Sequence, residues 1–564
     1  MLTTVVCDIA QLCFQAGVTQ FVISPGSRSA PLTLAMARHT GIETLVAPDE
    51  RSAAFIALGI ALAKKQPVGL VCTSGSAGLN YTPAVAEAYF QQVPLLLLTA
   101  DRPPEWIGQQ DGQTIYQQEL FGKHARYFAQ LPDSYGHPDK IWQLHRQVNE
   151  ALSVVNQQPQ GPVHLNVPFR EPFYPDKNAE WKYRELPLFE SWKGERVLGN
   201  GYWKQLEDEW GRYQRKLIVV GQQRLNPELA ANISKLARLE KIPVLADLLS
   251  NLHGLDGVIR HHDSFLFNKD LWNELQPDLL ITIGDSVISK STKQFLRAKP
   301  STMHWHIQEE GLVADAFQQL KRVIGISPDS FFKQMVNRHI RAASEAQAQY
   351  RKLWFNQEER AREVLAGWME QDKYWSEISA VYHLVKNLPD KATILGANST
   401  AIRYLSWVGL PAKLKKVELL ANRGTSGIDG CSSTALGYAL AVDEPVYLLT
   451  GDVAFFYDRN AFWGHKLPTN LKIVLINNHA GGIFRLISGP AAQPELGAFF
   501  ETEQPLTAEL LCQEFGINYL PANNKEEYTH QLKKISEAET ISLVEVFFDS
   551  AENASIFAQF KQLW

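Results

Sequence analysis

Short apolar runs alternate with longer stretches of helical periodicity along the whole chain. The runs are four to six residues long and lack polar–apolar alternation, which is typical of strands buried on both faces of a parallel sheet. We expect strands at 21–24, 68–73, 94–99 and 163–168, then at 216–221, 242–247, 279–284 and 303–307, and finally at 392–397, 417–421, 445–450, 471–476 and 541–547. The pattern predicts an α/β protein with doubly wound, mainly parallel sheets.

Two breaks separate these strands into three groups. Residues 169–200 are polar and aromatic, contain three prolines and show no regular period, so we expect an extended linker. Residues 328–385 are charged and helical, and we expect a helical connection there. Three α/β domains are therefore predicted, at residues 1–180, 195–345 and 370–564.

One phrase occurs in both the first and the third domain. "ALGIALAKKQPVGLV" begins at Ala57 and "ALGYALAVDEPVYLL" begins at Ala435. Each predicts the end of a helix, a break and then a buried strand. Chance is one explanation, since Ala and Leu are common in helices. The other is that the first and third domains are related and each holds one end of a ligand.

Composition narrows the classes of function. The chain has 564 residues, of which 45% are hydrophobic and 20% charged, and its net charge of −5 gives no reason to expect nucleic acid or a membrane surface as partner. The apolar runs are too short to cross a membrane, and no secretory signal is evident. The five cysteines are scattered without CxxC spacing, so neither disulfides nor a zinc site is expected. We expect a cytoplasmic protein.

Candidate metal ligands follow two strands of the third domain. Asp452 lies at the end of one strand, and Asn477 and Asn478 lie at the end of the next. In open α/β sheets ligands bind beyond the carboxyl ends of strands, and carboxylate and amide oxygens suit Mg²⁺. The glycine turn in "HAGGIF" (479–484) could admit a diphosphate. The alternative is an ordinary Gly-Asp turn and a helix cap.

The pair formed by Gly451-Asp452 and Asn477-Asn478 resembles the metal–diphosphate motif of thiamine diphosphate enzymes. The resemblance implies a pyrimidine-binding and a diphosphate-binding domain of common fold, which would explain the repeated phrase. It also implies a homo-oligomer, a dimer or a dimer of dimers, with active sites at the subunit interface. Val453 departs from the motif, which usually has a further glycine at that position.

The same resemblance assigns roles around the cofactor. Glu50 matches the glutamate that acts beside the aminopyrimidine ring, and Ile428 matches the apolar residue that keeps the cofactor bent. The implied thiamine diphosphate-binding set is Glu50, Ser74, Gly75, Ile428, Gly451, Asp452, Asn478, Ile483 and Phe484. Mg²⁺ or Mn²⁺ would be held by Asp452, Asn478 and the carbonyl of Ala480, where the family usually has glycine. Taken alone, Glu50 could be a helix-dipole acid and Ile428 a core residue.

Four further motifs resemble one branch of this family, the carboligases of menaquinone biosynthesis. They are "SPGSRSAPLTLA" (24–35), "TADRPPE" (99–105), "GQTIYQ" (112–117) and "NRGTSGIDG" (422–430). The resemblance implies a transferase that decarboxylates 2-oxoglutarate and adds the resulting four-carbon unit to isochorismate. It assigns substrate binding to Ser27, Arg28, Arg102, Gln113, Lys290, Ser399, Arg403 and Arg423. Both substrates are dianions, so arginines are the expected ligands, although any one of them could be a surface ion pair.

Two other functions remain open at this point. One is another thiamine diphosphate-dependent 2-oxoacid decarboxylase or an acetohydroxyacid-type synthase. The other is a non-catalytic nucleotide-binding or regulatory protein. The chain contains neither GxxxxGK[ST] nor GxGxxG, which argues against a P-loop NTPase and a dinucleotide oxidoreductase. The histidine pairs in "HHD" (261–263) and "HWH" (304–306) are interpreted as structural.

Overall fold

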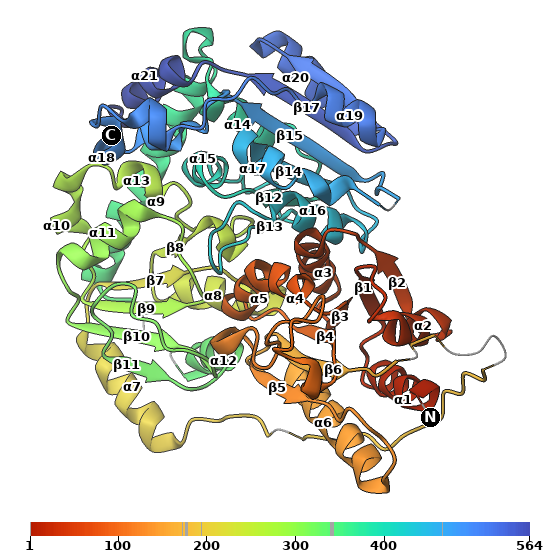
Figure 1. Ribbon diagram of the computed structural model, residues 1–564. Helices are drawn as coiled ribbons and strands as arrows, with labels where there is room; N and C mark the ends of the chain where they lie inside the picture. Colours follow the sequence, from red (N-terminus) through yellow and green to blue (C-terminus); the bar gives the residue numbers. More distant parts are fainter. Residues whose placement is uncertain (1, 172, 175–178, 193, 339–342, 465) are drawn as a thin grey trace. The chain divides into compact units, whose positions relative to one another are not determined.

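The chain folds around three parallel β-sheets (Figure 1). The structure is a computed structural model and describes residues 2–171, 173–174, 179–192, 194–338, 343–464 and 466–564. The first sheet contains β1 (Gln20–Ile23), β2 (Glu43–Val46), β3 (Val68–Cys72), β4 (Leu95–Asp101), β5 (Tyr127–Gln130) and β6 (Val163–Pro168). The second contains β7 (Lys216–Val220), β8 (Val244–Ala246), β9 (Leu279–Ile283), β10 (Met303–Ile307) and β11 (Arg322–Ile324). The third contains β12 (Thr393–Gly396), β13 (Glu418–Leu420), β14 (Val446–Gly451), β15 (Leu471–Asn477), β16 (Asn518–Ala522) and β17 (Ser542–Phe547).

The first and third sheets have the same strand order. The first runs β2-β1-β3-β4-β6-β5 and the third β13-β12-β14-β15-β17-β16, so each reads 2-1-3-4-6-5 in its own numbering. The middle sheet, β11-β10-β9-β7-β8, has the same order without a sixth strand. The strands pair in parallel, with Phe21 opposite Gly69 in the first sheet and Ile473 opposite Leu543 in the third. The predictions of doubly wound parallel sheets and of related first and third domains are confirmed. The expected domain boundaries stay a prediction.

All four strands that the sequence did not predict, β2, β5, β11 and β16, lie at sheet edges. An edge strand is partly open to solvent and need not be continuously apolar. In β2 none of the four residues is buried, and β16 contains Pro521, which is tolerated at an edge.

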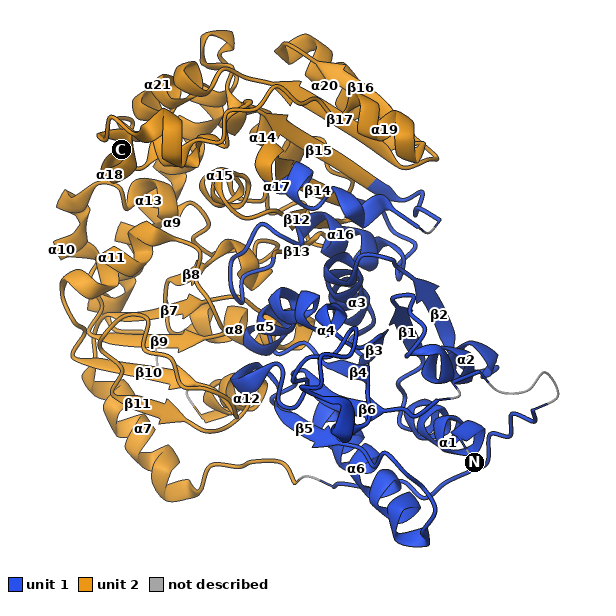
Figure 2. Ribbon diagram, in the orientation of Figure 1, with its two compact units in different colours: residues 1–193, 422–446, 454–471 blue, residues 194–421, 447–453, 472–564 orange. Residues whose placement is uncertain are grey.

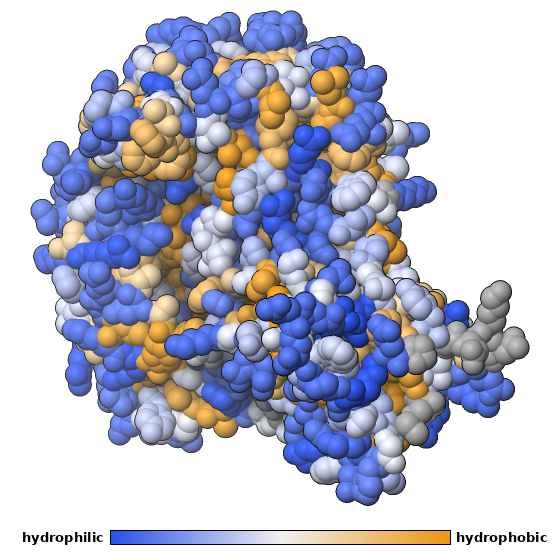
Figure 3. Space-filling view, in the orientation of Figure 1, coloured by the Kyte–Doolittle hydropathy of each residue, from blue (hydrophilic) through white to orange (hydrophobic). Residues whose placement is uncertain are grey.

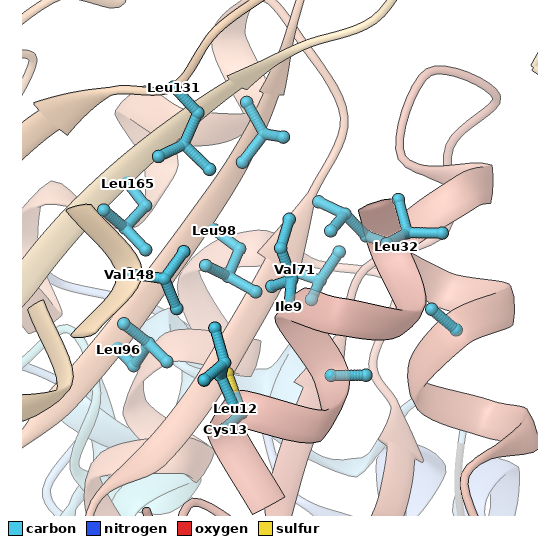
Figure 4. Close-up of a cluster of buried hydrophobic side chains, with 14 of the residues drawn as sticks. Ile9, Leu12, Cys13, Leu32, Val71, Leu96, Leu98, Leu131, Val148 and Leu165 are labelled. Atoms are coloured by element: carbon cyan, nitrogen blue, oxygen red, sulfur yellow. The ribbon is translucent and has the colours of Figure 1, made fainter. Parts of the chain in front are cut away.

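Helices cover both faces of the first sheet. They are α1 (Leu2–Gln15), α2 (Ala30–Arg38), α3 (Glu50–Lys64), α4 (Ser76–Asn80), α5 (Thr82–Phe90) and α6 (Pro138–Asn156). On one face, side chains of α1, α2 and α6 form a core with the strands, in which Ile9, Val71 and Leu98 lie close together (Figure 4). On the other, α3 packs against β1 and β3. This packing fixes the positions of the strand ends.

The second and third sheets are covered in the same way. The middle sheet carries α7 (Asn200–Arg212), α8 (Pro227–Leu239), α9 (His262–Phe265), α10 (Trp272–Leu275), α11 (Lys290–Ala298), α12 (Pro328–Arg338) and α13 (Glu345–Met369). The third region contains α14 (Glu377–Lys386), α15 (Thr400–Val408), α16 (Cys431–Ala439), α17 (Asp452–Tyr457), α18 (Ser488–Ala491), α19 (Glu509–Phe515), α20 (Lys525–Glu537) and α21 (Ser550–Lys561). The described residues of 328–385, where we expected a helical connection, lie mostly in packed helices. Both α12 and α13 contribute core residues to the middle sheet, while α14 packs against α15 and α20.

The chain divides into two compact units (Figure 2). Unit 1 comprises residues 1–193, 422–446 and 454–471, and unit 2 comprises residues 194–421, 447–453 and 472–564. Helix α16, which carries the second copy of the repeated phrase, thus belongs to the same unit as α3, which carries the first. Each unit is described by itself below.

The two copies of the phrase pack directly on each other in unit 1. A Cβ atom added at Gly59 would lie 2.1 Å from the carbonyl oxygen of Thr434, and one added at Gly437 would lie 2.0 Å from that of Ile56. These glycines hold matching positions in the two phrases. Their missing side chains let the backbones of α3 and α16 approach closely.

Replacing Gly437 by Ala is expected to destabilise the protein by about 1–3 kcal/mol or more, because a methyl group there meets backbone that cannot rotate away. Gly367 in α13 is the matched control, since it has open space around it. There the same change should stabilise by about 0.4–1 kcal/mol. Urea denaturation of both variants measures the difference, and equal midpoints would contradict the close contact between α3 and α16.

Candidate functional site

Several of the predicted site residues follow the strands at which the winding of the first and third sheets reverses. In the first sheet the reversal lies between β1 and β3, and in the third between β12 and β14. Ligands of open α/β sheets bind at such switch points. Ser27 and Arg28 follow β1, and Ser74 and Gly75 follow β3. In the third sheet Ser399 lies shortly after β12. Gly451 is the last residue of β14, and Asp452 is the first residue of α17 (Figure 1).

Glu50 begins α3 in unit 1 and is half-buried. Burial raises the pKa of its carboxyl group, and the neighbouring charge of Asp49 adds to the effect. The buried hydroxyl groups of Thr73 and Ser74, at the end of β3, have no hydrogen-bond partner among the described residues. Buried polar groups are normally paired. Two hydroxyl groups without a partner in the described part of the chain therefore remain at this end of the sheet.

Two predicted arginines flank the ends of β4 and β6. Arg28 is buried, donates from Nη1 to the carbonyl oxygen of Phe169 at 2.9 Å and lies over the ring of Phe173. Phe169 in turn donates its N–H to the carbonyl of Asp101, next to Arg102. Arg102 pairs through Nε with the carboxylate of Asp111 at 2.8 Å. Arg102 also donates through Nε and Nη2 to the carbonyl of Gly112, so the loop 111–112 holds its guanidinium group in place.

Gln113 lies against the loop after β3. Its backbone would be 3.3 Å from a Cβ atom at Gly75, and its φ of 56° is uncommon for a residue with a side chain. Such backbone strain is often stored at functional sites. Ser27, the remaining substrate candidate of this region, is exposed and precedes the buried Arg28.

A buried polar network joins this loop to Arg102, and the sequence did not predict it. Gln117 accepts from the N–H of Gly75 at 2.9 Å and donates to Asn166 Oδ1 at 2.8 Å. Asn166 donates to Asp101 Oδ2 at 2.6 Å, and Asp101 Oδ1 accepts from the N–H of Arg102 at 2.7 Å. One chain of hydrogen bonds thus joins Gly75, a cofactor candidate, to Arg102, a substrate candidate.

The loop 422–430 carries two further candidates, Arg423 and Ile428, both half-buried. Glu87, fully buried in α5, holds this loop by accepting from the N–H groups of Gly424 at 2.7 Å and Thr425 at 2.6 Å. The only sequence signal for Glu87 is an acid inside an otherwise apolar helical stretch, 82–90.

The candidate metal ligands of unit 2 converge. The N–H of Ala480 donates to both Asp452 Oδ2 and Asn478 Oδ1, each at 3.1 Å, so the two oxygens lie on the same side of this turn. Both side chains are buried, and burial raises the pKa of Asp452. A carboxylate and an amide oxygen side by side fit a hard divalent cation. The described residues contain no cluster of three or more His, Cys, Asp or Glu side chains that could hold a metal, and this pair of oxygens is not such a cluster.

The departure at Val453 has a structural counterpart. A Cβ atom at Gly481 would lie 2.7 Å from Val453 Cγ2, so the larger residue is accommodated by a glycine opposite it. Gly481 also has a φ of +62°, which favours glycine. The turn 479–482 is therefore shaped around Val453.

The i,i+4 spacing of Ser399 and Arg403 predicts that both lie on one face of a helix. The structure corrects this prediction, because Ser399 lies before α15. Ser399 is the N-cap, with φ 77° and ψ −129°, a conformation that residues with a side chain rarely adopt. Arg403 reaches back and donates to the carbonyl of Ser399, so the two do lie together.

The three remaining candidates lie on other elements. Lys290 is exposed at the start of α11. Ile483 and Phe484 lie in the short helix Gly482–Leu486, and Phe484 is exposed.

The two histidine pairs are held within the protein. His304 and His306 both hydrogen-bond to Thr282, and His261 pairs with Glu358. The five cysteines are free and buried.

Comparisons with known proteins cover almost the whole chain. Residues 3–124 match the N-terminal TPP-binding domain of thiamine pyrophosphate enzymes, residues 179–395 their middle domain and residues 414–546 their C-terminal TPP-binding domain. The 2-succinyl-5-enolpyruvyl-6-hydroxy-3-cyclohexene-1-carboxylate synthase of Cytophaga hutchinsonii is 42% identical, with 98% of each chain covered. The chain belongs to this synthase family. Proteins of the same name from Flavobacterium johnsoniae and Bacteroides thetaiotaomicron are 35% and 33% identical over 99% and 96% of this chain, and over 98% and 96% of their own.

Solved structures extend the likeness of fold beyond the synthase family. Benzoylformate decarboxylase from Polynucleobacter necessarius superposes with a TM-score of 0.70 at 15% identity, covering 97% of this chain and 98% of that one. A thiamine diphosphate-dependent 4-hydroxybenzoylformate decarboxylase from Rhodococcus jostii gives 0.69 at 16% identity, covering 96% and 99%. The predicted resemblance to thiamine diphosphate enzymes is confirmed, and the chain is an enzyme that binds this cofactor.

Proposed function

We propose that the protein decarboxylates 2-oxoglutarate and adds the remaining four-carbon unit to isochorismate in a 1,4-addition, releasing CO₂ and 2-succinyl-5-enolpyruvyl-6-hydroxy-3-cyclohexene-1-carboxylate. This is a transferase reaction of menaquinone biosynthesis. The observation that carries the proposal is full-length similarity to synthases of that name. Arg28 and Arg102 support it, because Arg28 donates to the carbonyl of Phe169, which in turn bonds to Asp101, the residue before Arg102. A dianionic acceptor needs such a local basic site in a chain whose net charge is −5.

The cofactor-binding roles are assigned residue by residue. Thiamine diphosphate, when bound, supplies the electron sink for loss of CO₂ from a 2-oxoacid. Asp452, Asn478 and the carbonyl of Ala480 would hold Mg²⁺ or Mn²⁺, because their oxygens are of the kind that hard cations prefer. Glu50 would hold and move a proton at the aminopyrimidine ring, and burial, which raises the pKa of its carboxyl group, favours its protonated form.

The substrate side is divided between acceptor and donor. We assign Ser27, Arg28, Arg102 and Gln113 to isochorismate, and Ser399 and Arg403 to the distal carboxylate of 2-oxoglutarate. Bidentate guanidinium–carboxylate pairs fix orientation as well as charge. Lys290 and Arg423 are proposed as further anion contacts.

Assembly and location complete the proposal. We propose a homo-oligomer of two or four copies, as the resemblance to thiamine diphosphate enzymes implies, and a cytoplasmic location, which free buried cysteines support. Among the described helices none is both long and apolar enough to cross a bilayer. Hydrophilic residues predominate on the face in Figure 3, and apolar residues form small separate areas there.

Arg28→Ala and Arg403→Ala should separate the two substrates. Loss of a charge-assisted pair costs about 1.5–3 kcal/mol, so Arg28→Ala should lower kcat/KM for isochorismate roughly 10- to 150-fold. Slow CO₂ release from 2-oxoglutarate without acceptor should survive. Arg403→Ala should instead impair 2-oxoglutarate, with a smaller penalty for pyruvate, which lacks the distal carboxylate. Equal impairment of both substrates by both variants would contradict the assignment.

The proposed donor is tested by the CO₂ released from 2-oxoglutarate and from pyruvate, with and without isochorismate. We expect release from 2-oxoglutarate to be faster and to accelerate when isochorismate is present. If CO₂ is released from pyruvate at the same rate with and without isochorismate, the protein is a different 2-oxoacid decarboxylase. No release from either, with no rise in melting temperature on adding thiamine diphosphate and Mg²⁺, would indicate a non-catalytic protein.

A further inference from the structure

Glu377 is a buried carboxylate in contact with a candidate metal ligand. It is the first residue of α14, is fully buried, and accepts from Asn478 Nδ2 through Oε1 at 2.7 Å. Its own N–H donates to Asn553 Oδ1 at 3.1 Å, which fixes this end of the helix. Burying a carboxylate away from water is costly unless its contacts compensate for it. The hydrogen bond from Asn478 is one such contact, and it joins Glu377 to the candidate metal site.

The two ends of the Asn478 side chain have different partners. An amide group has nearly the same shape in both orientations, and its hydrogen bonds decide which end points where. Glu377 Oε1 accepts from Nδ2 at 2.7 Å, so this contact holds the NH₂ end of the amide. The oxygen end then faces the N–H of Ala480, on the same side as Asp452 Oδ2. The Ala480 N–H is shared between these two oxygens at 3.1 Å each. Its hydrogen bond to Asn478 is therefore weaker than the bond between Asn478 and Glu377, which is 2.7 Å long.

We propose that Glu377 is a positioning residue for the metal site: it fixes the amide of Asn478 with its oxygen toward the cation and its NH₂ group away from it. Without Glu377 the NH₂ group could turn toward the cation, where it cannot act as a ligand. This inference rests on the proposed metal site and assigns to it a residue outside the ligand set. Residues that orient metal ligands typically change metal affinity by roughly 10- to 100-fold when they are replaced.

The test is a titration of the apo protein with Mg²⁺ at a fixed concentration of thiamine diphosphate. Binding is monitored by the intrinsic fluorescence of the protein's 14 tryptophans and by calorimetry. Glu377→Ala should raise the Mg²⁺ concentration at half-saturation by about 10-fold or more. Glu377→Gln should stay within about 3-fold of the wild type, since its Oε1 can still accept from Asn478. Cofactor affinity at saturating Mg²⁺ should change far less than the Mg²⁺ requirement does. A merely structural role would not give this split.

A second background tests the orientation itself. Asn478→Asp replaces an amide by a carboxylate, whose two oxygens are equivalent ligands. In that background Glu377→Ala should no longer raise the Mg²⁺ requirement, and should lower it by removing a second acid in contact with the first. Glu358→Ala is the control for loss of a buried carboxylate, because Glu358 holds His261 in the middle region. It should lower the melting temperature and leave the Mg²⁺ requirement unchanged.

Three outcomes would overturn the proposal. An unchanged Mg²⁺ requirement in folded Glu377→Ala would remove the positioning role and leave the metal site intact. Equal loss in Glu377→Gln and Glu377→Ala would show that the oxygen at this position is not what matters. Mg²⁺-independent binding of thiamine diphosphate by the wild type would remove the metal site, and with it the role of Glu377.

Discussion

Glu50→Gln should lower turnover by at least about 100-fold, the scale of a lost general acid–base interaction. The amide keeps the size of the side chain at the start of α3 but cannot exchange a proton with the aminopyrimidine ring. Thiamine diphosphate should still bind, because the proposed metal ligands lie on other elements, at the ends of β14 and β15. Turnover at saturating cofactor and calorimetric affinity for thiamine diphosphate measure the two effects separately.

Asp49→Asn is the matched control for this change. Asp49 is the N-cap of α3 and accepts from the N–H of Ser52 at 3.2 Å, and Asn is an equally good cap. This variant also removes a negative charge beside Glu50, yet it should keep turnover within a few-fold of the wild type. Near-normal turnover of Glu50→Gln would contradict the role of Glu50.

Asp452→Ala should abolish Mg²⁺-dependent binding of thiamine diphosphate without unfolding the chain. Asp452 is the first residue of α17, directly after the carboxyl end of β14, and its buried side chain is polar and not part of the apolar core. Loss of a direct ligand should exceed the roughly 10- to 100-fold effect of losing a residue that only orients one. The measurement is the affinity for thiamine diphosphate as a function of Mg²⁺ concentration.

Asp458→Asn serves as the control for Asp452→Ala. Asp458 is also fully buried, but it bonds the N–H and hydroxyl of Ser433 in unit 1, and burial raises its pKa to about 7. Its amide variant should keep the Mg²⁺ dependence. Unchanged cofactor binding in Asp452→Ala, or an equal loss in both variants, would contradict a metal site at Asp452.

The fold could be predicted from the sequence wherever its signals are local. Central strands such as β4 and β15 are buried along their whole length, so their apolar runs stand out. Edge strands such as β2 carry no such run. The repeated phrase predicted that two domains are related, but not that Gly59 and Gly437 let its two helices pack on each other. That contact joins residues far apart in the chain, and no local pattern encodes it.

The same division holds for the candidate site. Asp452, Asn478 and Arg28 were predicted because each follows a strand inside a short motif. Glu377, Glu87 and Gln117 were not, because each acts through a partner distant in sequence. At the first turn of a helix, an acid such as Glu377 looks like any residue that complements the helix dipole. Only the bond to Asn478 distinguishes it.

The most direct test of the proposed function is the product of one reaction. The wild-type protein is incubated with 2-oxoglutarate, isochorismate, thiamine diphosphate and Mg²⁺, and the products are analysed by mass spectrometry. We expect a single adduct whose mass equals the sum of the two substrates minus CO₂, absent when either substrate is omitted. Unreacted isochorismate beside succinic semialdehyde, or no consumption of 2-oxoglutarate, would contradict the proposed carboligation.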